Sequence, residues 1–127
     1  MKTIGVVTVG RSDFGILRPL LNEIEQHGGL NLVLYVTGAH LSPEFGNTQD
    51  EITEAGFEVA EKVEVTLSSD SAAGISKSMG LGVLGFSEVF SRQAPDILVI
   101  MGDRFEMMAA ALAAVPFNIQ IAHIHGG

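Results

Sequence analysis

The fold is decided near the amino terminus, where residues 2–36 read KTIGVVTVGRSDFGILRPLLNEIEQHGGLNLVLYV. The mostly β-branched residues at 2–9 predict a strand that stops at a glycine. Apolar side chains then recur at helical spacing, which predicts a helix over 13–26 with Ser12 as its cap. Residues 30–36 are apolar nearly throughout, as in a strand covered on both faces. The stretch therefore predicts a strand–helix–strand unit with two parallel strands.

The same alternation continues to the end of the chain, which at 127 residues is long enough for one domain, 1–127. The other elements predicted are a helical turn after Ser42–Pro43, a helix at 48–55 with capping-box spacing, a strand near the sheet edge at 57–65, a helix at 72–93, a buried strand at 96–101, a helix at 104–114 and a buried strand at 119–124. Strands alternating with helices predict an α/β fold with a doubly wound parallel sheet, Rossmann-like in type. Glycines in the first part of the long helix suggest close packing or close approach to a ligand.

Composition excludes several kinds of function. The formal net charge is −8 and no basic stripe is visible, which argues against nucleic-acid binding. The chain has no cysteine, so disulfides, thiolate metal sites and a catalytic cysteine are excluded. No apolar run is long enough to span a membrane, and no secretory signal is recognised, so we expect a cytoplasmic protein without membrane partners.

Ligands of such folds bind beyond the carboxyl ends of the strands. The first candidate there is the loop Gly10–Gly15, whose amides at a helix start and whose Arg11 guanidinium suit a phosphate. The dinucleotide fingerprint GxGxxG is absent, and a tight turn capped by Ser12 is the alternative. The second is Gly38 with His40, where the imidazole either binds a ligand or packs on its own turn.

Two further candidates follow the last two strands. Asp103 is placed to reach the site, but its spacing to Glu106 also fits helix capping, and Arg104 can pair with Glu106. His123 and His125 are two apart, so a strand would turn both imidazoles to one side. That spacing fits a metal pair, a metal-free proton-transfer site, or a structural role for His123.

Five segments together resemble the hydrolysing UDP-N-acetylglucosamine 2-epimerases. They are GRSDFGILRPLL (10–21), VTGAHLSPEFGNT (36–48), SKSMGLGVLGFSEVF (76–90), GDRFEMMAAALAA (102–114) and NIQIAHIHGG (118–127). GDRFE followed by HIHGG is the most specific pair, and the resemblance covers the whole chain in order.

The resemblance implies the amino-terminal half of a two-domain, glycosyltransferase-B-like enzyme that uses neither metal nor cofactor. The substrate is a UDP-sugar, either UDP-N-acetylglucosamine or a UDP-diacetamido-trideoxy sugar. Removal of the C2 proton with loss of UDP gives a 2-acetamidoglucal, and water then adds with inversion at C2. This chemistry needs a base, an acid for the leaving phosphate and a group that activates water. The free product is N-acetylmannosamine or its analogue, as in sialic-acid-type biosynthesis.

The resemblance also assigns residues. Asp103 and His125 are the expected catalytic residues, although some relatives carry glutamate at the place of His125. The expected substrate-binding residues are Arg11, Gly38, His40, Ser78, Arg104 and Gly126.

The family pattern continues beyond Gly127 with a glutamate and a carboxyl-terminal UDP-binding domain. We therefore expect a fragment that is inactive alone, from an enzyme that is a homo-oligomer at full length. Two alternatives remain open, half of a glycosyltransferase and a non-catalytic nucleotide-binding module.

Overall fold

A computed structural model describes residues 1–42, 48–65 and 71–125. Five parallel strands form one sheet in the order β3-β2-β1-β4-β5. In chain order the elements are β1 (Lys2–Thr8), α1 (Arg11–Gln26), β2 (Leu30–Thr37), the 3-10 helix η1 (Gly38–Leu41), α2 (Gln49–Glu54), β3 (Glu61–Val63), α3 (Ala72–Arg92), β4 (Ile97–Met101), α4 (Phe105–Ala114), the 3-10 helix η3 (Val115–Phe117) and β5 (Gln120–Ile124). The predicted doubly wound parallel sheet is confirmed, with the strand order reversing between β1 and β4.

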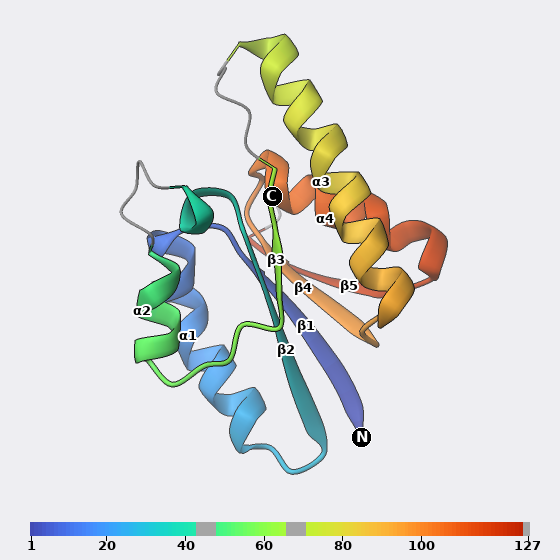
Figure 1. Cartoon of the computed structure of the whole chain (residues 1–127). Coiled ribbons are helices and arrows are strands. Elements are labelled where there is room, and N and C mark those ends of the chain that lie inside the picture. The colour runs from blue at the N-terminus through green and yellow to red at the C-terminus, as the bar shows by residue number, and fades with distance from the viewer. Residues whose placement is uncertain (43–47, 66–70, 126–127) are drawn as a thin grey trace.

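Helices cover both faces of the sheet, with α1 and α2 on one face and α3 and α4 on the other (Figure 1). Successive side chains of β1 and of Val9, just after it, point to opposite faces of the sheet and therefore enter two different cores. Ile4 and Val6 pack in the core under α1 and α2, whereas Val7 and Val9 pack in the core under α3 and α4. β1 and β2 are apolar nearly throughout because helices cover both faces of these two strands.

Two glycines of α3 allow close packing in the second core. A Cβ at Gly82 would lie 2.9 Å from Cβ of Ala109 on α4, and one at Gly85 would lie 2.6 Å from Cγ1 of Val63 on β3. By contrast, a Cβ at Gly80 would meet nothing within 4 Å. Of the two roles that the sequence suggested for these glycines, close packing is therefore confirmed at Gly82 and Gly85.

The structure corrects several predicted details. The third strand is confined to Glu61–Val63, and β5 is a largely exposed edge strand rather than a buried one. The cap of α1 is Gly10, not Ser12, and the cap of α4 is Arg104, not Asp103. Thr48 does precede α2, but its side chain makes no capping hydrogen bond. The turn predicted after Ser42–Pro43 lies largely outside the described residues.

Within the described ranges, no helix has the length and apolar character needed to cross a bilayer.

Candidate functional site

A crevice of about 470 Å³ opens at the carboxyl ends of the strands. Its walls come from the β1–α1 junction, from η1, from the start of α2 and from the residue before α4. The lining residues are Gly10, Arg11, Ser12, Ala39, Thr48 and Arg104. Two of the seven Lys and Arg residues of this acidic chain border this one crevice. Each of the two is paired with a glutamate, so the crevice offers an anionic ligand two guanidinium groups rather than an excess of positive charge.

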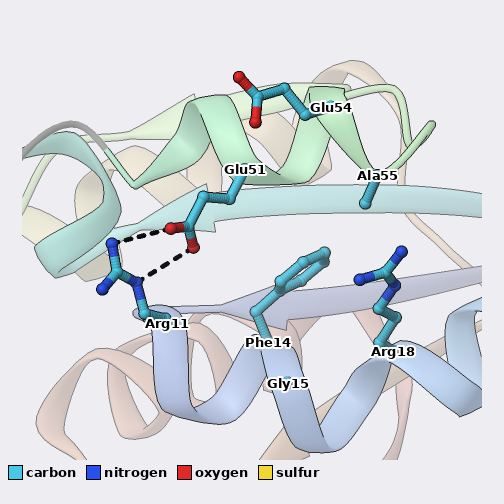
Figure 2. Close-up of a pocket in the computed structure, with 7 residues that line it drawn as sticks. All are labelled: Arg11, Phe14, Gly15, Arg18, Glu51, Glu54 and Ala55. Atoms are coloured by element: carbon cyan, nitrogen blue, oxygen red, sulfur yellow. Dashed lines mark hydrogen bonds and ion pairs between the residues drawn. The ribbon is translucent and has the colours of Figure 1, made fainter.

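Arg11 is engaged by a carboxylate of α2. Its Nε donates to Oε2 of Glu51 at 3.1 Å and its Nη2 lies 2.8 Å from Oε1, so one full edge of the guanidinium is occupied (Figure 2). Arg11 also borders a second hollow of about 410 Å³ between α1 and α2, with Phe14 and Arg18 (Figure 2). Both partners of the pair are substantially exposed, so an incoming anion can compete with Glu51.

The turn between β1 and α1 is fixed from inside by Asp13. Its carboxylate accepts the amides of Val9 and Gly10 at 3.0 and 3.2 Å and the hydroxyl of Thr8. The amides of Val9 and Gly10 therefore already have an acceptor within the protein. The amides of Arg11 and Ser12, the first two helical residues, remain as the helix-terminus donors that border the crevice.

Behind the crevice, His40 is fully buried and hydrogen-bonded through both ring nitrogens. Nε2 lies 2.9 Å from Oγ1 of Thr8 and Nδ1 lies 2.8 Å from Oγ1 of Thr48. Because the Thr8 proton goes to Asp13, Thr8 accepts from His40 Nε2–H. In the neutral ring Nδ1 then accepts from Thr48, which assigns the tautomer from the network.

This chain of hydrogen bonds ties the start of α2 to the β1–α1 turn. Burial lowers the pKa of His40 from its ordinary 6.5, against the opposing influence of the Asp13 and Glu51 carboxylates. The imidazole is therefore held neutral, and its direct role in ligand binding stays a prediction.

The β4–α4 junction carries Asp103 and Arg104. Asp103 is exposed and lines a neighbouring hollow of about 380 Å³ with Met107 and His123, while Arg104 borders both spaces. The predicted pairing of Arg104 with Glu106 is confirmed, with Nε 3.5 Å from Oε1. Capping of α4 by Asp103 is wrong, so this side chain is left available at the site face.

The two histidines near the end of the chain do not share one strand face. His123 donates from Nε2 to the carbonyl of Gly102 at 2.6 Å, which steadies the β4–α4 turn. β5 ends at Ile124, and His125 has φ 56°, so the two-residue strand period no longer applies to it. The amide of Gly102 donates to the carbonyl of Ile124 at 2.9 Å, so Asp103 and His125 follow adjoining strand ends.

The remaining predicted residues lie at different depths. Gly38 is buried behind the crevice wall, Ser78 is buried on α3 away from the crevice lining, and Gly126 lies outside the described residues. The structure thus brings Arg11 and Arg104 together at one crevice.

Sequence reasoning missed Asp13 and Glu51. Asp13 accepts amides of the β1–α1 turn, and Glu51 reaches Arg11 because α2 packs beside α1. Among residues 1–42, 48–65 and 71–125, no group of three or more His, Asp or Glu side chains is placed to hold a metal ion.

A parallel sheet whose strand order reverses beside a crevice with two arginines defines a doubly wound α/β protein, a class in which ligands bind beyond the carboxyl ends of the strands. Residues 22–127 match the family model described as UDP-N-acetylglucosamine 2-epimerase, and the chain belongs to this family.

Relatives from bacteria match along nearly the whole chain. It is 39% identical over 127 residues to a UDP-N,N'-diacetylbacillosamine 2-epimerase (hydrolyzing) of Legionella pneumophila, covering 100% of this chain and 34% of that protein. It is also 39% identical over 126 residues to a GDP/UDP-N,N'-diacetylbacillosamine 2-epimerase (hydrolyzing) of Campylobacter jejuni, covering 99% and 33%. A UDP-N-acetylglucosamine 2-epimerase of Neisseria meningitidis is 35% identical and is covered to 33%. The chain therefore spans about a third of the length of these relatives.

Solved structures show the same fold. A UDP-N-acetylglucosamine 2-epimerase superposes with a TM-score of 0.83 at 19% identity, over 99% of this chain and 33% of that one. The Neisseria meningitidis enzyme bound to UDP-GlcNAc superposes with a TM-score of 0.80 at 20% identity, over 100% and 33%.

Proposed function

We propose that this chain forms the amino-terminal domain of a hydrolysing 2-epimerase that acts on a UDP-linked N-acetylated amino sugar. The observation that carries the proposal is the crevice between Arg11 and Arg104 at the switch point of a chain from this family. The reaction releases UDP and the C2-inverted free sugar. A second, UDP-binding domain completes the site in the full-length enzyme, as the length of the relatives supports.

Each part of the crevice has a task in this proposal. Arg11, Arg104 and the first amides of α1 bind the diphosphate, because guanidinium groups and helix amides are strong donors to phosphate oxygens. Asp103 and His125 follow adjoining strand ends and serve proton transfer at C2 and at the leaving group. Gly38 lies in the turn beside Val9 and Glu106, while His40 supports the wall from behind. Gly126 stays a predicted binding residue outside the described residues.

For the sugar, the names of the two relatives at 39% identity favour a UDP-N,N'-diacetylbacillosamine. UDP-N-acetylglucosamine is the competing substrate, because the relative from Neisseria meningitidis acts on it by name. The free product in either case suits a route to sialic-acid-type sugars, and the relative named polysialic acid biosynthesis protein P7 supports that context.

The test is turnover by the full-length protein with each UDP-sugar, followed as released UDP. We expect Asp103→Asn to reduce turnover by about 100-fold or more while the fold is retained, as is usual for loss of a proton-transfer group. Asp96→Asn is the matched control, since Asp96 lies before β4, at the opposite end of the same strand, where its carboxylate accepts the Thr3 amide.

Unchanged turnover in Asp103→Asn contradicts the catalytic role. Transfer of the sugar to an acceptor, in place of a free sugar, favours a glycosyltransferase. UDP binding without any turnover favours a nucleotide-binding module.

A further inference from the structure

Glu106 is a carboxylate with an unusual place in the fold. It belongs to the first turn of α4, where the positive end of the helix dipole favours an acid, yet it is only 3% exposed. A buried carboxylate is costly unless it is paired, so its partners decide its role. The sequence pattern suggested helix capping or a pairing with Arg104 for it, and gave no sign of its burial.

One of its oxygens holds Arg104. Oε1 contacts Nε of Arg104 at 3.5 Å, while the arginine side chain is 58% exposed and borders the crevice. Among the described residues, the terminal guanidinium nitrogens of Arg104 make no hydrogen bond or ion pair. Arg11 differs, since Glu51 occupies both its Nε and its Nη2. Arg104 is therefore held at Nε, while its terminal nitrogens are available to a ligand.

The other oxygen lies against the β2–η1 turn. A Cβ at Gly38 would lie 2.8 Å from Oε2 of Glu106 and 2.6 Å from Cγ1 of Val9, and Gly38 has φ +62°. Only glycine fits this place without strain. The carboxylate thus lies at the start of α4, close against the turn after β2 and on the side of the sheet edge where the strand order reverses.

We propose that Glu106 is a positioning residue, which orients the Arg104 guanidinium toward the crevice and thereby sets the affinity for the diphosphate of the UDP-sugar. The inference rests on the proposed function and deepens it. Orientation matters because an arginine free to rotate loses more conformational freedom when it binds phosphate.

The experiment is a double-mutant cycle in the full-length protein, with UDP binding measured by calorimetry. We expect Glu106→Gln to weaken UDP binding by about 3- to 10-fold, the effect of a charge-assisted contact. We expect no more than a twofold further change when Glu106→Gln is added to Arg104→Ala, since both act through one guanidinium. In kinetics KM rises with kcat nearly unchanged, as for loss of binding common to ground and transition state.

Glu61→Gln is the matched control, because Glu61 pairs with Arg92 on an exposed surface away from the crevice. If Glu106→Gln does not fold, Arg104→Lys carries the test, since it keeps the charge and removes the tethered Nε; we expect a comparable loss of affinity.

The inference is overturned if Glu106→Gln weakens UDP binding equally with and without Arg104, or if Arg104→Lys binds UDP like the unaltered protein. Absence of UDP binding by the unaltered full-length protein contradicts the proposed function itself, so the two failures are distinguishable.

Discussion

Arg11 and Arg104 border the same crevice but are held in opposite ways. Glu51 of α2 pairs with both Nε and Nη2 of Arg11, whereas the hydrogen bond between Glu106 and Arg104 involves Nε. A phosphate that binds Arg11 through the occupied edge must displace Glu51. The two glutamates therefore have opposite expected effects on anion affinity, although both form ion pairs with crevice arginines.

Glu51→Gln tests this difference. We expect UDP to bind the full-length variant up to about 5-fold more tightly, because the competing ion pair is exposed and is worth at most about 1 kcal/mol. Competition calorimetry with UDP measures the change. A weaker affinity contradicts the view that Glu51 competes with the ligand.

His40 predicts a pH dependence of stability. Its pKa in the fold is lowered from the ordinary 6.5 by burial, so the unfolded chain takes up the proton first as the pH falls. The stabilisation by the neutral network is thus complete above about pH 6.5 and is lost progressively as the pH drops below that value, toward the lower folded-state pKa.

Urea unfolding between pH 5 and pH 8 measures this dependence. We expect His40→Phe to lower the free energy of unfolding at pH 8 and to flatten its decline toward pH 5. His27→Gln, at an exposed position, serves as the control and retains the decline. An unaltered slope in His40→Phe contradicts the assignment to His40.

Among the helices, α3 and α4 pack closely because small residues, Gly82 and Ala109, face each other at their contact. Gly82→Ala sets its new Cβ 2.9 Å from the Cβ of Ala109, so the helices must separate. We expect the free energy of unfolding to fall by roughly 1–2 kcal/mol, because overpacking outweighs the gain in helix propensity.

Gly80→Ala in the same helix is the matched comparison, since open space surrounds that position. We expect it to stabilise the fold by up to about 1 kcal/mol. Unfolding midpoints in urea measure both variants, and equal effects of the two substitutions contradict the packing explanation.

The elements were predicted well where one periodicity dominates. The strand–helix–strand unit of residues 2–36 has long apolar runs, so its strands and helix could be placed from sequence. Local hydrogen bonds could not be placed, because they depend on competing partners in space. Thr48 bonds His40 rather than capping α2, and Asp13, not Ser12, secures the start of α1.

The place of the candidate site could also be predicted from the pattern of strands, but the surroundings of its side chains could not. The rule that ligands bind at the carboxyl ends of parallel strands singled out Arg11 and Arg104, and both border one crevice there, while their role in substrate binding stays a prediction. That rule cannot tell which side chains face inward, so the full burial of His40 and the buried carboxylate of Glu106 needed the structure.

At the scale of the whole molecule, this chain spans about a third of its relatives. Five exposed large apolar side chains lie on α4, on η3 and on the edge strand β5, namely Met108, Leu112, Val115, Phe117 and Ile121. Such a surface is usually covered by further structure. Homo-oligomerisation at full length and a cytoplasmic location stay predictions.

We expect the 127-residue chain by itself to bind UDP weakly and to release no UDP from UDP-N-acetylglucosamine, because it spans about a third of its relatives and the proposed function needs a second domain to complete the site. Release of UDP by the purified chain contradicts this view.

The proposed activity is tested by the reaction of the full-length protein with UDP-N,N'-diacetylbacillosamine and UDP-N-acetylglucosamine in deuterated water, followed by NMR. We expect free UDP and a free sugar that is inverted at C2 and carries deuterium there. A free sugar with unchanged C2 configuration and no deuterium contradicts the proposed activity.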